Sequence, residues 1–110
     1  MKQIAFLLFM ATLTGCAKLD IESGTPNCIV KEIKRFNRNI ACESANVKEY
    51  SFQSKTVYLF EQGTCGADMS SDVLSSDCQK IGYIGGISGN GEVNGGDFYT
   101  ATFLRTVWEK

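Results

Sequence analysis

Four oxygen-bearing side chains near the C-terminus have the types and spacing that could hold a calcium ion. Asn90, Glu92, Asn94 and Asp97 lie on alternate or nearby residues of a glycine-rich segment, and Ca²⁺ takes carboxylate and amide oxygens as ligands. Their spacing does not fit the EF-hand register, and no downstream Glu occupies its closing position. Residues 85–97 could instead bind another small ligand, or simply connect two strands through tight turns, for which dense glycine is suited.

Histidine is absent from the sequence, which excludes every Ser-His, Cys-His and His-metal arrangement. The remaining candidates for hydrolysis are three carboxylates, Asp68, Asp72 and Asp77, in a serine-rich stretch between two cysteines. A catalytic pair needs two environments that separate the pKa values of its members, whereas this stretch has the composition of a surface turn. We therefore expect no enzymatic activity and no cofactor.

The five cysteines divide into Cys16, near the N-terminus, and four in the body of the chain. An even number in a small exported domain is typical of two disulfides. Of the three pairings that four cysteines allow, we expect Cys28–Cys42 and Cys65–Cys78, because each pair brackets one local unit. Zinc is the alternative, but the close cysteine pairs of structural zinc sites are missing, so we expect no metal.

Residues 1–15 have the three-part order of a secretory signal peptide. Lys2 precedes an apolar run over residues 4–13, and two small residues follow the run. A membrane-spanning helix needs roughly twenty apolar residues, so the run is too short to be one. Its end, Leu13-Thr14-Gly15-Cys16, resembles the lipobox of bacterial lipoproteins, in which the cysteine is acylated and becomes the first residue of the mature chain.

The lipobox resemblance implies an anchored protein. Residues 16–24 would form a mobile lipidated tether, since two or more acyl chains on Cys16 hold a chain stably at a bilayer. Ala17, rather than Asp, follows the cysteine; by resemblance to the sorting rule of Gram-negative lipoproteins, this implies the outer membrane, with either face open. The partners would be the membrane, through the lipid, and a protein of the envelope.

Residues 25–110 have the length of one small domain. The whole chain of 110 residues contains 11 Lys and Arg against 12 Asp and Glu, a formal net charge of −1. Proteins that bind nucleic acid usually carry a clustered basic footprint. No such cluster is evident, so we expect no nucleic-acid partner.

The first element that we expect is an amphipathic helix. Thr25 has the character of an N-cap, and Pro26 suits the first helical position. Apolar residues then recur at spacings of three and four until the helix ends near residue 38. The basic side chains are expected to form a solvated face, with contact to anionic lipid as the alternative. The apolar stripe is Ile29, Ile33, Phe36 and Ile40, and the basic residues are Lys31, Lys34, Arg35 and Arg38.

The rest of the domain is expected to be an antiparallel sheet. Residues 47–52 and 56–60 should form a hairpin whose second strand is central, because it is apolar on both faces. Residues 61–78 look like a loop, and Asp97 can cap a short helical turn. Further strands are expected over residues 79–84 and 103–108, with Trp108 in the core. The predicted fold is α+β: one N-terminal amphipathic helix packed on a small antiparallel sheet, braced by two disulfides.

Two turns, Cys65-Gly66-Ala67-Asp68-Met69 and Gly85-Gly86-Ile87-Ser88-Gly89-Asn90, are similar to those of a family of small bacterial lipoproteins that carry one domain of unknown function. The resemblance implies an envelope location and supplies no activity. We expect a lipid-anchored envelope domain with a non-enzymatic binding or structural role. The alternatives are an inhibitor of a secreted or periplasmic hydrolase, such as a lysozyme or protease, that presents loop 65–78 or 85–96, and a module that binds calcium or a small ligand through residues 85–97.

Overall fold

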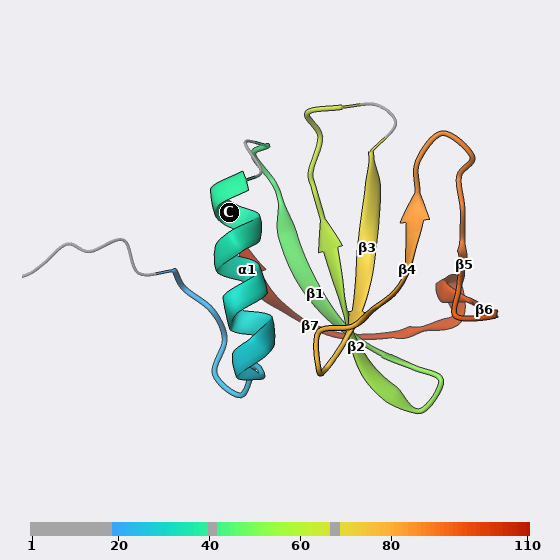
Figure 1. Ribbon diagram of the computed structural model, residues 1–110, viewed down its shortest axis with the longest axis horizontal. Helices are drawn as coiled ribbons and strands as arrows, with labels where there is room; N and C mark the ends of the chain where they lie inside the picture. The colour runs from blue at the N-terminus through green and yellow to red at the C-terminus, as the bar shows by residue number, and fades with distance from the viewer. Residues whose placement is uncertain (1–18, 40–41, 67–68) are drawn as a thin grey trace, which may run out of the picture.

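The computed structural model describes residues 19–39, 42–66 and 69–110. Within them, one helix precedes an antiparallel sheet of seven strands (Figure 1). A single 3₁₀ turn, η1 (Phe98–Thr100), lies between the last two strands. The other elements are α1 (Asn27–Asn39), β1 (Asn46–Phe52), β2 (Lys55–Glu61), β3 (Ser70–Ser75), β4 (Lys80–Gly85), β5 (Glu92–Val93), β6 (Gly96–Asp97) and β7 (Thr102–Glu109).

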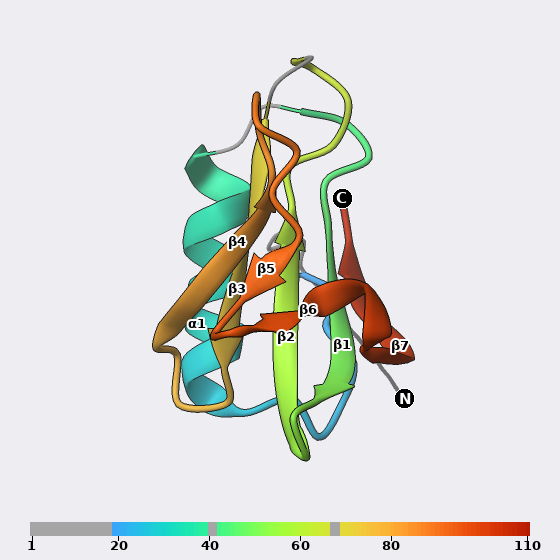
Figure 2. The same ribbon diagram turned by 90° about the vertical axis from the view of Figure 1, so that its right-hand side faces the viewer.

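The sheet is strongly curled. Its strand order is β6-β5-β4-β3-β2-β1-β7, so that β6 and β7, which are neighbours in sequence, form its two opposite edges. Only the short η1 segment joins these edges, and the sheet therefore has to curve until they approach each other (Figure 2). The predicted combination of one helix with an antiparallel sheet is confirmed, but the sheet is larger than expected.

The helix begins slightly later than predicted. The amide of Val30 donates to the carbonyl of Pro26, 3.0 Å away, so Pro26 occupies the N-cap position. The hydroxyl of Thr25 instead donates to the carbonyl of Glu22, at 2.7 Å. The expected N-cap role of Thr25 is therefore wrong. Thr25 holds the chain that leads into the helix, and the helix itself spans Asn27–Asn39.

The apolar stripe of α1 packs on one face of the sheet. Ile29 and Ile33 are completely buried, and the ring of Phe36 lies edge-on to Phe60, 5.3 Å away, and to Trp108, 6.1 Å away. The predicted core role of Trp108 is thus confirmed. Ile40 lies outside the described residues. The sheet side of this core consists of Ala45, Val47, Tyr58, Phe60, Leu74, Val107 and Trp108.

The predicted hairpin is present as β1 and β2. Phe52 pairs with Lys55 across a two-residue turn, in which Gln53 and Ser54 both have positive φ, 52° and 62°. Positive φ at both central positions is the mark of a type I′ turn, whose twist suits a two-residue hairpin. β2 lies between β1 and β3, and its four residues 57–60 are buried, as expected for a central strand.

The second face of the sheet has its own core. Phe98 of η1 lies over this face, with its ring 5.2 Å from Tyr50 and 5.2 Å from Phe52. The turn depends on Asp97, whose carboxylate accepts from the amide of Tyr99 at 3.0 Å, as the sequence predicts. With α1 on one face and η1 on the other, both faces of the central strands are shielded from solvent. The buried residues of this second core are Phe52, Val57, Leu59, Val73, Val93 and Phe98.

Residues 61–78, expected to be a loop, contain a full strand, β3 (Ser70–Ser75). Serine and aspartate have little preference for strands, and for that reason the segment resembles a turn. Here β3 pairs with β2 on one side and β4 on the other, so ladder hydrogen bonds and the buried side chains of Val73 and Leu74 override local preference.

The disulfide pairing differs from the predicted one. Cys28 pairs with Cys78 and Cys42 with Cys65, with Cα–Cα distances of 6.1 and 5.2 Å. The expected pairs, Cys28–Cys42 and Cys65–Cys78, are therefore wrong. Cys28 lies in the first turn of the 13-residue helix and Cys42 follows its end, so the helix holds them apart, since a helix rises about 1.5 Å per residue. Each bridge instead joins an end of the helical region to a turn of the sheet.

Candidate functional site

Three of the four oxygen-bearing residues of segment 85–97 have separate structural roles. The Asn90 side chain donates to the carbonyls of Tyr83 and Glu92, at 2.6 and 2.9 Å, and so closes the turn after β4. The Asn94 side chain donates to the Gln53 side chain, 2.9 Å away. Asp97 caps η1, and Glu92 is exposed. The predicted ligand residues are thus spread over a turn, a cross-link and a cap.

The link between Gln53 and Asn94 is reciprocal. The Gln53 amide also donates to the backbone carbonyl of Asn94, at 3.2 Å. These two hydrogen bonds join the β1–β2 turn to the β5–β6 turn across the open end of the curled sheet. The glycine-rich segment therefore contains a turn that is hydrogen-bonded to a second hairpin turn.

The carboxylates considered for hydrolysis are also dispersed. Asp72 forms an ion pair with Lys80, 3.2 Å away, on the exposed surface. Asp77 accepts a short hydrogen bond from the hydroxyl of Ser75, and this bond lowers the pKa of the Asp77 carboxyl. Asp68 lies outside the described residues. Across the described part of the chain, no polar or charged residue is fully buried, and no cluster of three or more acidic or cysteine side chains could hold a metal.

The N-terminal segment, residues 19–24, packs on the domain. Leu19 and Ile21 contact the core beneath α1, and the amide of Glu22 donates to the carbonyl of Val107 in β7, at 3.0 Å. The expected mobile tether over residues 16–24 is therefore held against the domain from Leu19 onward. Most residues of this segment are polar, but Leu19 and Ile21 are apolar and alternate with Asp20 and Glu22. This alternation was the sequence signal that could have indicated packing of the segment on the domain.

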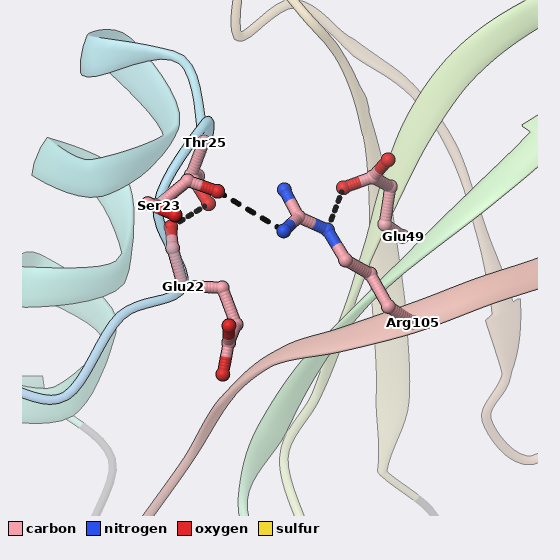
Figure 3. A network of polar contacts seen from close by, with 5 residues as sticks. All are labelled: Glu22, Ser23, Thr25, Glu49 and Arg105. Carbon is pink, nitrogen blue, oxygen red and sulfur yellow. Dashed lines mark hydrogen bonds and ion pairs between the residues drawn. The ribbon is translucent and has the colours of Figure 1, made fainter.

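Arg105 fixes the same segment from the sheet side (Figure 3). Its Nε donates to Glu49 Oε1 at 2.9 Å, and one terminal nitrogen donates to the carbonyl of Ser23 at 3.0 Å. The bond to Glu49 raises the pKa of the Arg105 guanidinium. Because β1 supplies Glu49 and β7 supplies Arg105, one side chain joins two strands to the N-terminal segment. Sequence alone offered no signal for this contact, since Glu49 and Arg105 are 56 residues apart.

A groove of about 670 Å³ runs between the docked segment and α1. Leu19, Ile21 and Val30 supply apolar walls, and Lys34 and Arg38 stand at its edge. The groove thus combines an apolar lining with two cationic side chains and one acidic residue, Glu22. The groove lies where the chain leads back toward Cys16, which is itself outside the described residues, and a second hollow, lined by Asp20 and Glu22, lies beside the same segment.

The exposed face of α1 is basic. At 100° per residue, Lys31, Lys34, Arg35 and Arg38 fall within one arc on the side away from Ile29 and Ile33, and all four are exposed. Arg35 forms an ion pair with Glu32, at 2.8 Å. No described acidic side chain lies within ion-pair distance of the other three. The basic side chains that were expected to share one face of the helix thus form an exposed basic stripe.

The sequence that forms this helix and curled sheet matches a known family. A family model described as a domain of unknown function, DUF6970, matches residues 34–110, and the chain belongs to that family. The match covers the second half of α1 and the whole sheet. No curated protein and no solved structure matches the chain. Within the described residues, no helix has the length and apolar character needed to cross a membrane.

Proposed function

We propose that the protein is a lipid-anchored domain of the bacterial cell envelope, with a non-enzymatic binding or structural role. The observation that carries the proposal is the motif Leu13-Thr14-Gly15-Cys16 at the end of the apolar run over residues 4–13. In such a motif, the cysteine thiol displaces the phosphate ester of a phospholipid headgroup. The Sγ forms a thioether to the glyceryl carbon, the thiol proton leaves with the phosphate, and water then cleaves the peptide bond before the cysteine.

The disulfides support this assignment of Cys16. The two bonds use Cys28, Cys78, Cys42 and Cys65. Of the five cysteines in the sequence, Cys16 is the one that these bonds do not include. A disulfide-braced fold is typical of proteins outside the reducing cytosol. The pairing therefore agrees with export and leaves the thiol of Cys16 for acylation.

The position of the anchor relative to the domain also supports the proposal. Leu19, the first described residue, is three residues after Cys16 and already packs on the core. An extended chain spans at most about 3.3–3.6 Å per residue, so the acylated residue would lie within about 11 Å of the folded surface. The domain would be held directly at the membrane rather than at the end of a long linker.

Mass spectrometry of the protein purified from a bacterial envelope tests the proposal. The expected N-terminal residue is Cys16 bearing a diacylglyceryl group, in the membrane fraction. The Cys16→Ser variant should lose that modification, while Ala17→Ser, the neighbouring substitution that keeps the thiol, should retain it. Recovery of the unmodified protein with Met1 still attached, or with cleavage at another residue, would refute the proposal.

A hydrolase inhibitor is a second candidate, favoured by one observation. Ile87, at the tip of the turn between β4 and β5, is 88% exposed. An apolar side chain on a projecting turn could enter the specificity pocket of an enzyme. Inhibition of a panel of lysozymes and proteases should then be lost in Ile87→Asp and kept in Leu104→Asp, which changes another exposed apolar residue. Equal inhibition by both variants, or none by the parent, would eliminate this candidate.

A further inference from the structure

We infer that the basic stripe of α1 is a docking surface for anionic phospholipid, so that the anchored domain lies with this helix along the bilayer. The inference rests on the proposed acylation of Cys16. It goes beyond the anchor because it assigns an orientation and a lipid class to a face of the fold. The face consists of Lys31, Lys34, Arg35 and Arg38, together with the adjacent groove.

The first argument is the short reach of the anchor. Leu19 lies three positions after Cys16, a span of at most about 11 Å. Leu19 lines the same groove as Lys34 and Arg38. Figure 1 shows the N-terminal end of the described chain on the same side of the sheet as α1. A lipid on Cys16 therefore brings this side of the molecule, and not the β5–β6 edge, to the membrane.

The second argument is charge complementarity at that distance. Electrostatic attraction to a membrane acts over about a Debye length, which is roughly 10 Å at 0.1 M and 8 Å at 0.15 M ionic strength. The greatest reach of the anchor, about 11 Å, is comparable to this length. Lys31, Lys34 and Arg38 have no acidic partner among the described residues, so their charge is available to a headgroup phosphate. Each basic residue near an anionic surface strengthens binding about fivefold.

The acidic residues of the docked segment lie mainly on its other side, although Glu22 also lines the groove beside Lys34 and Arg38. Asp20 and Glu22 line a separate hollow with Thr106 and Glu109, on the β7 side of the segment. Leu19 and Ile21, which alternate with them, turn toward the core and the groove. Three carboxylates, Asp20, Glu22 and Glu109, thus surround the hollow beside β7, whereas Glu22 alone borders the groove beside α1. An anionic bilayer would attract the α1 side and repel the β7 side, which selects one orientation.

The test uses the acylated full-length protein in vesicles. One preparation contains phosphatidylcholine alone, and the other contains equal parts of phosphatidylcholine and phosphatidylglycerol. An amine-reactive ester then labels lysines, and mass spectrometry gives the rate at each site. Lys48 is the internal reference, because it lies on the face of the sheet opposite α1, two residues before Tyr50 of the second core.

We expect Lys31 and Lys34 to react about three to seven times more slowly in the anionic vesicles, relative to Lys48. A surface potential of about −30 to −50 mV concentrates protons by that factor, and only the neutral amine reacts. High salt should remove the difference. The inference would be overturned if the labelling rates of Lys31 and Lys34, relative to that of Lys48, were the same in both vesicles, or if Lys48 were the residue that reacted more slowly in the anionic vesicles. Either result would leave the anchor intact.

Two double variants distinguish an effect of the basic stripe from an effect of the net charge of the protein. Lys34→Gln/Arg38→Gln should restore most of the reactivity of Lys31 in anionic vesicles. The matched control Lys55→Gln/Lys80→Gln removes the same charge from exposed positions outside the stripe and should leave Lys31 protected. Equal effects of the two variants would overturn the assigned surface. Failure of the proposed function is distinguishable, because the Cys16 peptide would then carry no lipid and the protein would not float with either vesicle.

Discussion

Cys28 and Cys78 form a disulfide that joins the first turn of α1 to the turn between β3 and β4, across 50 residues of sequence. The second bond, Cys42–Cys65, joins the segment after the helix to the segment after β2 across 23 residues. Both ends of the helical region are therefore attached covalently to the sheet. The basic stripe of α1 consequently has a fixed direction relative to the rest of the domain.

The longer bridge should contribute more to stability. In the chain-entropy account, closing loops of 50 and 23 residues stabilises a protein by about 4 and 3 kcal/mol. We therefore expect Cys28→Ala/Cys78→Ala to lower the free energy of unfolding more than Cys42→Ala/Cys65→Ala. Urea titration of the oxidised proteins measures both. A non-reducing peptide map that linked Cys28 to Cys42 would contradict the pairing itself.

Arg105 should control whether the N-terminal segment stays docked. The variant Arg105→Gln loses the hydrogen bonds to Glu49 and to the Ser23 carbonyl. The hydrogen bond from the Glu22 amide to the Val107 carbonyl should therefore break more often. Hydrogen exchange of that amide should become several-fold faster while β2 is unchanged. Arg35→Gln, which breaks only an exposed pair within α1, is the control and should leave Glu22 unaffected.

Gly63 occupies a position where a side chain would not fit. Its φ is 97°, and a Cβ there would lie 2.5 Å from the carbonyl oxygen of Glu43. Gly63→Ala should therefore lower the free energy of unfolding by about 2–4 kcal/mol, from backbone strain and steric overlap together. Gly95 has φ of 79° but no atom within 4 Å of such a Cβ. Gly95→Ala should cost only about 1–2 kcal/mol, and equal losses in urea titrations would refute the steric argument.

Tyr58 should make the fold sensitive to alkaline pH. Burial raises the pKa of its phenol above the ordinary value of 10.0, so the folded state holds the proton more tightly than the unfolded state. The corresponding stability is present below pH 10 and is lost as pH rises through the folded pKa. Tyr58→Phe should therefore retain more of its neutral-pH stability above pH 10 than the parent protein does. Tyr83→Phe, which changes an exposed ring, should follow the parent.

The sequence by itself determined the elements whose evidence is local. The spacing of Ile29 and Ile33 indicates which face of the helix is buried, because that spacing is set by the helical repeat. The two-residue alternation of side chains in β1 and the apolar run of β2 likewise predict a hairpin whose second strand is central. The motif that ends at Cys16 is also local, and the proposed anchor depends on the sequence alone.

Only the tertiary structure decided what depends on distant neighbours. Ser70–Ser75 became a strand because it pairs on both sides, and the cysteines paired across elements because the helix holds Cys28 and Cys42 apart. Leu19 and Ile21 docked because the core beneath α1 accepts them. In each case the free energy comes from contacts between segments far apart in the chain, which local spacing does not record. The same contacts bring the basic stripe of α1 beside the chain that leads to Cys16.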